Sequence, residues 1–266
     1  MNDILEKIVR QRLEDFANKK SMKTELESRL RDRNDFRPFH ESLRQKASQN
    51  GTAAIIAETK RGSPSLGLLR PDLDPAKTAR EDERGGAACL SVLTEPRFFH
   101  GKMEDLIVAR KHCKLPVLQK DFIVTELQVL EAALHADAML LIARCLERSQ
   151  LADLAGLAET YRLDVLLEVF DEADLEKIDG LNVPLIGINH RDLATMEVDL
   201  EHSRFLIDHF QAGQTIVAAS GIRSRNDIER LMTLGIRSFL VGETLSRSKD
   251  RAETLQQLVL EAGHEH

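Results

Sequence analysis

The sequence is poor in several residue types that mark particular classes of protein. It has no tryptophan, one tyrosine and only three cysteines among 266 residues. Cys89, Cys113 and Cys145 are far apart, show no paired metal-binding spacing, and by their odd number leave at least one cysteine unpaired within a monomer. The nine histidines are scattered, without a His-x-x-His or His-Glu-x-x-His grouping. We therefore expect a reducing compartment and no metal site.

Long apolar runs and an excess of positive charge are also missing. No window approaches the roughly 18 consecutive apolar residues of a membrane helix, and the N-terminal MNDILEKIVRQRLEDF carries charges throughout, unlike a signal peptide. The formal net charge is -7, which gives no overall positive field for holding nucleic acid. The sequence thus predicts a soluble, cytoplasmic protein that binds neither a membrane nor nucleic acid.

One pattern recurs along most of the chain: a short apolar run rich in Val, Ile and Leu, followed by a segment with helical periodicity. The apolar runs span residues 53–59, 88–93, 116–122, 137–143, 164–170, 184–189, 215–220 and 238–242. The helical segments span residues 76–85, 103–113, 125–134, 149–161, 172–177, 203–208, 224–233 and 251–262. Strands that are apolar on both faces and alternate with helices predict a parallel sheet. Eight such units in about 210 residues predict a (β/α)8 TIM barrel over residues 51–266.

Residues 1–50 precede the first predicted strand and are expected to form an N-terminal helical extension. Apolar residues at helical spacing predict an amphipathic helix over residues 3–20. The charged segment 19–36 has the composition of a solvated helix or loop. Phe36, Phe39 and Leu43 then predict a second helix that docks on the body of the protein.

A doubly wound open sheet is the alternative fold. Such a fold usually carries a Gly-rich dinucleotide-binding turn after its first strand. The first loop here reads KRGSPSLG, which is not that fingerprint. The barrel is therefore favoured, and no cofactor is expected.

The first predicted strand ends in charged residues and opens into a loop of small residues. Glu58 and Lys60 are two positions apart, so in an extended strand their side chains project to the same side. A carboxylate and an ammonium then meet at the mouth of the barrel. On this stretch alone, a structural ion pair and a catalytic pair are about equally good interpretations.

Polar residues follow most of the predicted strands, and in a TIM barrel these strand ends form the active face. They are Glu58, Lys60, Ser63, Ser65, Ser91, Thr94, Lys120, Asp121, Glu168, Asn189, His190, Arg191, Ser220, Gly221, Gly242 and Glu243. Each alone could simply cap a helix or pair with a neighbour. Two lysines and two glutamates in one mouth would shift one another's pKa values, as acid–base chemistry near neutral pH requires.

The last two strands lead into segments 220–222 and 242–244, each expected to open a short helix. In TIM barrels these two loops commonly bind phosphate, because small residues let backbone N–H groups face the anion. A small phosphorylated substrate is implied.

The motifs at these strand ends closely resemble indole-3-glycerol phosphate synthases of tryptophan biosynthesis. The resemblance covers nearly the whole chain and rests on ILEKIV, AETKRGSPSLG, SVLTEPRFFHGK, LPVLQKDFI, LLEVFD, GINHRDL, ASGI and LVGETL. It implies a lyase that closes the ring of 1-(2-carboxyphenylamino)-1-deoxyribulose 5-phosphate, with loss of CO₂ and water, to give indole-3-glycerol phosphate. No cofactor is needed, and the resemblance leaves open a monomer or a weak homodimer.

The resemblance also implies roles for individual residues. Lys120 would be the general acid that protonates the ketose oxygen, and Glu168 the base in the dehydration. Glu58 and Lys60 would complete the charged group, with Lys60 near the substrate carboxylate or the leaving hydroxyl. The substrate's polar groups would be oriented by Ser63, Asn189 and Arg191, and its phosphate bound by Ser220, Gly221, Gly242 and Glu243.

The chain departs from the family's usual pattern at a few positions. Ala219 stands where a glutamate is usual, His190 where an asparagine is usual, and Leu127 and His135 replace a tyrosine and a glycine. A catalytically weak paralogue that binds a sugar phosphate or an anthranilate-like ligand is therefore an alternative. An isomerase or Schiff-base aldolase with Lys120 as nucleophile is a third, less favoured because fold alone does not carry function.

Overall fold

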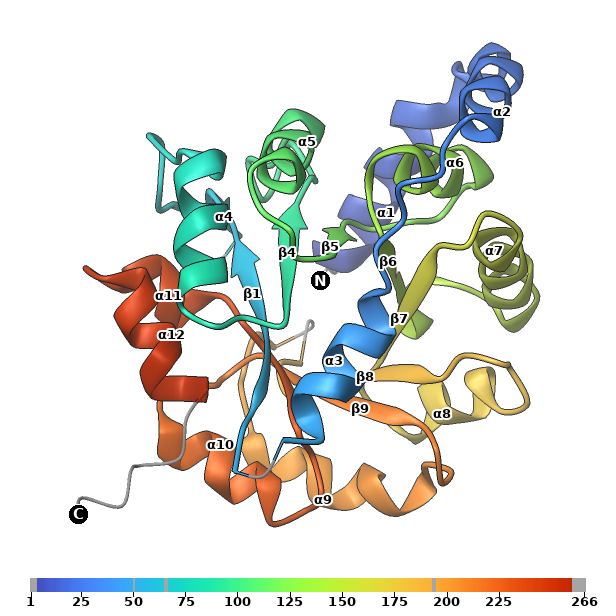
Figure 1. Ribbon diagram of the computed structural model, residues 1–266. Coiled ribbons are helices and arrows are strands. Elements are labelled where there is room, and N and C mark those ends of the chain that lie inside the picture. The colour runs from blue at the N-terminus through green and yellow to red at the C-terminus, as the bar shows by residue number, and fades with distance from the viewer. Residues whose placement is uncertain (1–3, 50, 65–66, 193–194, 260–266) are drawn as a thin grey trace.

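Eight parallel strands close into a barrel in the computed structural model, which describes residues 4–49, 51–64, 67–192 and 195–259 (Figure 1). The strands are β1 (Ala54–Thr59), β4 (Cys89–Leu93), β5 (Val117–Lys120), β6 (Ala138–Ile142), β7 (Asp164–Val169), β8 (Leu185–Asn189), β9 (Thr215–Ala219) and β10 (Ser238–Val241). Pairing of β1 with β10, in the register Ala54 to Ser238, closes the barrel. The predicted TIM barrel is confirmed, and each observed strand begins and ends within two residues of its predicted bounds.

Helices surround the barrel, and a small hairpin follows the first strand. The helices after β1 are α4 (Pro75–Arg84), α5 (Met103–Lys111), α6 (Glu126–His135), α7 (Arg148–Thr160), α8 (Glu172–Ile178), α9 (Ser203–Leu206), α10 (Arg225–Met232), α11 (Glu243–Arg247) and α12 (Arg251–Val259). The hairpin consists of β2 (Gly62–Ser63) and β3 (Gly67–Leu68). Several helices begin where the sequence supplies a cap: the side chains of Asp74, Thr125, Asp171 and Ser224 each accept a backbone N–H three residues on.

Alternate residues of each strand face two different cores. In β1, Ile55 and Ala57 pack between the sheet and the outer helices, whereas Ala54 and Ile56 pack inside the barrel. Side chains of a strand point alternately to opposite faces, so a strand with both faces buried needs an unbroken apolar run. This explains why the strands could be recognised as continuous runs.

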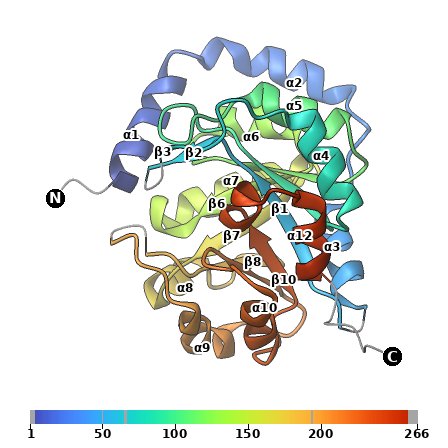
Figure 2. The same ribbon diagram turned by 90° about the vertical axis from the view of Figure 1, so that its left-hand side faces the viewer.

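Three helices precede the barrel: α1 (Ile4–Ala17), α2 (Lys23–Arg31) and α3 (Phe39–Ala47). Helix α2 packs against α6 on the outside of the barrel (Figure 2). Phe39 and Leu43 of α3 are fully buried with the first residues of the strands, such as Ala54, so α3 closes the N-terminal end of the barrel. Leu5 and Ile8 of α1 instead reach a cavity at the C-terminal strand ends. The extension therefore contacts both ends of the barrel.

A buried carboxylate fastens this extension to the barrel. Asp137, just before β6, accepts hydrogen bonds from Arg110 of α5 (Nη2, 2.8 Å) and from the backbone N–H groups of Arg37 and Val117 (both 3.0 Å). Arg33, which follows α2, also forms an ion pair with Asp137 (Nη2 to Oδ1, 3.4 Å). Segments from three parts of the chain thus meet at one side chain that is 0% exposed.

Replacing Asp137 with asparagine is expected to lower the free energy of unfolding by about 3 kcal/mol, because it removes the buried counter-charge of two largely buried guanidinium groups and leaves them only the exposed Asp35. Urea unfolding checks the value. Asp35 is the matched control, since it pairs with Arg33 and Arg110 but its side chain is 59% exposed. The Asp35→Asn variant should lose less than about 1 kcal/mol. Equal losses of unfolding free energy in the two variants would contradict the conclusion that Asp137 fastens the extension to the barrel.

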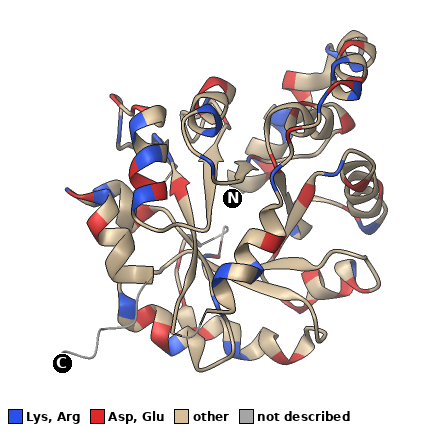
Figure 3. Cartoon of the chain, viewed as in Figure 1, with Lys and Arg blue, Asp and Glu red and all other residues tan. Residues whose placement is uncertain are grey.

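The described surface carries charges of both signs. Figure 3 shows Lys and Arg interspersed with Asp and Glu over the outer helices, while the strands are mostly uncharged. Within the described ranges, no helix is long and apolar enough to cross a membrane. The three cysteines are free, and Cys89 and Cys113 are buried.

Candidate active site

A cavity of about 630 Å³ opens at the C-terminal ends of the strands. All eleven residues to which the resemblance gives a role lie on its wall: Glu58, Lys60, Ser63, Lys120, Glu168, Asn189, Arg191, Ser220, Gly221, Gly242 and Glu243. Of the other candidates at the strand ends, Asp121 also lines the cavity, whereas Ser91, Thr94 and His190 do not. Ser65 lies outside the described residues. The strand ends therefore converge, and ten of the eleven residues stand at or just beyond the ends of barrel strands, with Ser63 in the hairpin that follows β1.

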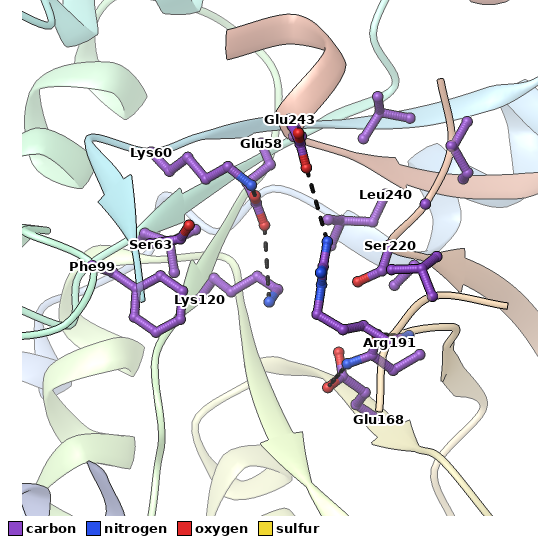
Figure 4. A pocket seen from close by; sticks show the side chains of 18 of the residues that line it. Glu58, Lys60, Ser63, Phe99, Lys120, Glu168, Arg191, Ser220, Leu240 and Glu243 are labelled. Carbon is purple, nitrogen blue, oxygen red and sulfur yellow. Dashed lines mark hydrogen bonds and ion pairs between the residues drawn. The ribbon is translucent and has the colours of Figure 1, made fainter. Parts of the chain in front are cut away.

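Two ammonium groups approach one buried carboxylate in this cavity. Glu58 Oε1 lies 2.9 Å from Lys60 Nζ, and Glu58 Oε2 lies 3.8 Å from Lys120 Nζ (Figure 4). Burial raises the pKa of Glu58, but the charges of Lys60 and Lys120 outweigh it and hold that pKa below its usual value. Glu58 therefore stays ionised and keeps both lysines at the mouth of the barrel.

The pKa of Glu168, at the end of β7, is shifted in the opposite direction to that of Glu58. Burial is the largest influence on its pKa and raises it; Lys120 and a hydrogen bond from Asn189 lower it only in part. Asn189 Nδ2 donates to Glu168 Oε1 at 2.9 Å, and Asn189 Oδ1 accepts the backbone N–H of Arg191 at 3.0 Å. The amide of Asn189 is thus fixed with its donor toward Glu168.

The cavity therefore holds two buried glutamates whose environments shift their pKa values in opposite directions. Such a pair assigns different tasks to chemically identical groups. Glu58 acts as a permanent negative charge, whereas Glu168 can take up and release a proton closer to neutral pH. Two ammonium groups lie beside these carboxylates, so the cavity contains the kinds of group that acid–base chemistry uses.

Gly242, at the end of β10, makes room for the Glu58–Lys60 pair. A Cβ atom at this position would overlap the Glu58 carboxylate and lie 3.0 Å from Lys60 Nζ. The backbone φ of Gly242 is -124°, so close approach and not an unusual backbone conformation requires the glycine. The first and last strands of the barrel are thereby fitted to each other at the site.

Replacing Gly242 with alanine is expected to lower kcat/KM by about a hundredfold, since a methyl group would displace Glu58 and both of its lysine partners. Steady-state kinetics on the purified variant measures the loss. Gly156 in α7 provides the control, because a Cβ there meets nothing within 4 Å. The Gly156→Ala variant should keep wild-type activity, and similar losses in both variants would contradict the steric argument.

The loop after β9 differs from its predicted form. Ser220 and Gly221 have φ values of +69° and +79°, and the next helix, α10, begins only at Arg225. The prediction of a short helix at 220–222 is therefore wrong, because residues whose backbone is in the left-handed conformation cannot start a right-handed helix. The expected helix at 242–244 is present as α11, for which Gly242 is the N-cap. A non-glycine residue at positive φ is strained, and such strain is common at functional sites.

His190 does not line the cavity, although the sequence placed it at an active strand end. Its Nε2 shares a hydrogen bond with Ser203 Oγ (2.6 Å) and its Nδ1 with the Ala219 carbonyl oxygen (2.9 Å). Burial lowers the pKa of His190 to about 4. The expectation that His190 stands on the active face is therefore wrong, and His190 is a structural residue between β8, β9 and α9.

One end of the cavity is apolar and carries residues to which sequence reasoning gave no role. Phe99, from the loop after β4, and Phe122, just beyond β5, lie with their ring centroids 5.8 Å apart. Ile8 and Leu5 of α1 continue this wall. The two phenylalanines belong to the motifs SVLTEPRFFHGK and KDF, but only the folded chain brings them together.

A comparison with protein families decides what kind of site this is. The family model described as indole-3-glycerol phosphate synthase matches residues 5–258, which is nearly the whole chain. The chain belongs to the indole-3-glycerol phosphate synthase family. The family resemblance of the sequence motifs is thereby confirmed.

Curated synthases match over almost their full length. The indole-3-glycerol phosphate synthase of Desulfosudis oleivorans is 48% identical over 97% of this chain and 99% of that protein. Those of Leptothrix cholodnii and Bordetella pertussis are each 43% identical, over 97% of this chain and 99% and 100% of theirs. The activity is that of an indole-3-glycerol phosphate synthase, a carboxy-lyase of tryptophan biosynthesis that acts on a small phosphorylated substrate.

Solved structures with low sequence identity support the fold alone. A thiamine phosphate pyrophosphorylase from Pyrococcus furiosus superimposes with a TM-score of 0.58 at 14% identity, covering 79% of this chain and 94% of that one. KGPDC from Streptococcus mutans gives a TM-score of 0.59 at 12% identity, covering 77% of this chain and 95% of that one. Both proteins have the same barrel fold as this chain.

Proposed function

We propose that this cavity closes the indole ring with Lys120 as general acid and Glu168 as general base. The observation that supports this most strongly is the convergence of two ammonium groups and two buried carboxylates around one cavity. Ring closure, decarboxylation and dehydration need proton donors and acceptors and no electron transfer, so these side chains are sufficient for the chemistry.

The first step forms a carbon–carbon bond. The aromatic carbon that bears the carboxylate attacks the ketose carbonyl, and the carbonyl oxygen takes a proton from the Lys120 ammonium. Loss of CO₂ then returns the electron pair to the ring. Glu58 holds the Lys120 and Lys60 ammonium groups beside each other, and we assign Lys60 to the substrate carboxylate or the leaving hydroxyl.

The second step removes water. The new hydroxyl group leaves with a proton from a neighbouring ammonium, and Glu168 accepts the proton that the five-membered ring gives up. A carboxylate whose pKa is raised by burial is a better base near neutral pH than an ordinary one. Asn189 fixes the position of Glu168 through its 2.9 Å hydrogen bond.

We assign the substrate's phosphate to the end of the cavity formed by the loops after β9 and β10. Backbone N–H groups of Ser220, Gly221, Gly242 and Glu243 are the proposed donors. Arg191 and Ser63 would orient the hydroxyl and carboxylate groups; the Arg191 side chain is held by the Met196 carbonyl oxygen (3.1 Å) and lies 3.8 Å from Glu243. The aromatic half of the substrate would then face Phe99 and Phe122.

We further propose that residues 1–50 act as an extension that helps to form the apolar end of the site, with residues 51–266 as the catalytic barrel. The support is that α1 supplies Leu5 and Ile8 to the cavity. A cytoplasmic location fits a chain with free cysteines. We keep a monomer or weak homodimer as the proposed state of assembly.

Mixing the purified protein with 1-(2-carboxyphenylamino)-1-deoxyribulose 5-phosphate tests this function. Indole fluorescence should rise against a low background, because the protein has no tryptophan and one tyrosine. The rise should disappear in the Lys120→Ala variant. Substrate binding without any indole product, unchanged when a glutamate is restored at position 219, would instead favour the ligand-binding alternative that Ala219 and His190 motivate.

A further inference from the structure

Another buried glutamate lies just behind the apolar wall of the cavity. Glu95 follows β4, is 0% exposed and does not line the cavity. Its Oε1 accepts the backbone N–H of Arg97 at 3.0 Å, and its Oε2 accepts those of Phe98 and Phe99 at 2.7 and 2.9 Å. In the described ranges no lysine or arginine forms an ion pair with it.

Burying a carboxylate is unfavourable unless hydrogen bonds replace its lost water. Three main-chain donors provide that compensation for Glu95, and in return they fix the backbone of three successive residues around one point. The loop is also closed from the other side, where Gly101 N–H donates to the Glu95 carbonyl oxygen at 2.8 Å. A Cβ at Gly101 would overlap the Leu93 carbonyl oxygen, so the loop is packed directly on the strand.

The last residue held in this way is Phe99, which lines the cavity. Its ring pairs with that of Phe122, two residues after Lys120. Figure 4 shows Phe99 beside Ser63, on the same side of the cavity as Lys120. Glu95 therefore sets the position of an aromatic ring at the end of the site that is nearest the proposed acid.

We propose that Glu95 is a positioning residue that holds Phe99 against the aromatic half of the substrate. The inference rests on the proposed function, which places that half between Phe99 and Phe122. Glu95 itself touches no reacting atom and acts only through the backbone of residues 97–99. Its loss should therefore weaken recognition of an aromatic group and leave the phosphate end of the cavity unchanged.

Two small probes separate the ends of the cavity: 2-aminobenzoate, followed by its own fluorescence, and inorganic phosphate, followed by calorimetry. The variants are Glu95→Gln, Phe99→Ala and the double substitution. Glutamine has the shape of glutamate but cannot accept all three N–H donors, because one of its terminal atoms is itself a donor. Thermal unfolding confirms that each variant is folded.

We expect Glu95→Gln and Phe99→Ala each to weaken 2-aminobenzoate binding by about five- to tenfold, as loss of one aromatic contact implies. The double variant should bind no more weakly than Phe99→Ala, and phosphate affinity should stay within about twofold of wild type. Multiplied losses in the double variant, or equal weakening of both probes, would overturn the inference and leave Glu95 as a purely structural residue.

The results for the single variants show whether a failure lies in the role of Glu95 or in the proposed function on which that role rests. If Phe99→Ala leaves 2-aminobenzoate binding unchanged, the proposed place of the aromatic half is wrong. If Phe99→Ala weakens binding and Glu95→Gln does not, only the role of Glu95 is wrong. Should Glu95→Gln fail to fold, Gly101→Ala replaces it, since it displaces the same loop while keeping both side chains, and the same pattern is expected.

Discussion

The Lys120→Met variant is expected to lose about a thousandfold in kcat, with kcat/KM falling by a similar factor. Lys120 Nζ lies 3.8 Å from Glu58, and it is the ammonium to which ring closure assigns the proton for the ketose oxygen. An interaction made only as charge develops on that oxygen lowers the barrier without contributing to substrate binding. Methionine keeps the length of the side chain, and Glu58 keeps its 2.9 Å partner Lys60.

The control for this prediction is Lys77→Met on α4, whose lysine side chain is 68% exposed and does not line the cavity. It should turn over substrate at the wild-type rate. Steady-state indole fluorescence measures both variants. A Lys120→Met enzyme within about tenfold of wild type would reassign the acid to Lys60, because general acid catalysis alone contributes more than that. Covalent trapping of the substrate on Lys120 by borohydride would instead point to Schiff-base chemistry.

The barrel could be predicted from the sequence because its signal is local. Each strand is buried on both faces and is therefore visible in the sequence as an unbroken apolar run. The strands lie around the barrel in the order in which they occur in the sequence. Once the barrel is accepted, the convergence of Glu58, Lys120 and Glu168 follows from topology, since every parallel strand ends at the same face. No knowledge of side-chain packing is needed for that step.

Other features could not be read in this way. The wall formed by Phe99 and Ile8 depends on how a loop and an outlying helix fold back over the mouth, and nothing in their spacing reports it. His190 was misjudged for a different reason. Residues two positions apart in a strand project to the same side, so Asn189 and Arg191 face the cavity and His190 faces the opposite side. The same alternation that placed Glu58 and Lys60 together would have excluded His190 from the active face.

Ala219 changes the balance of charge in the cavity. It lies on the cavity wall beside Leu240 of β10, its partner in the barrel register, so a methyl group stands where the resemblance leads us to expect a carboxylate. Among the described residues that line the cavity, three carry buried carboxylates: Glu58, Asp121 and Glu168. Asp121 is already held by an ion pair with Arg12 (3.0 Å). Glu58 is held ionised by two lysines. The role of base therefore falls on Glu168 alone, and its removal should not be rescued by a neighbour.

The Glu168→Gln variant is accordingly expected to lower kcat by about a thousandfold. The pKa of Glu168 is raised by burial, so wild-type activity should fall on the acid side as the pH drops through that raised value, and this acid limb should be missing from the residual activity of the variant. A pH–rate profile of both enzymes checks the prediction. An unchanged acid limb in the variant would assign that limb to another group.

The fall in kcat is not expected to come from unfolding. A carboxyl group whose pKa is raised in the folded state stabilises the protein below its unfolded pKa, and this stabilisation is lost as the pH rises through the folded value. At neutral pH the uncharged glutamine should therefore leave Tm unchanged or higher, while still accepting the Asn189 hydrogen bond. Glu131→Gln on α6 is the matched control, because burial also raises the pKa of Glu131 but its side chain lies outside the cavity. Only the Glu168 variant should lose activity.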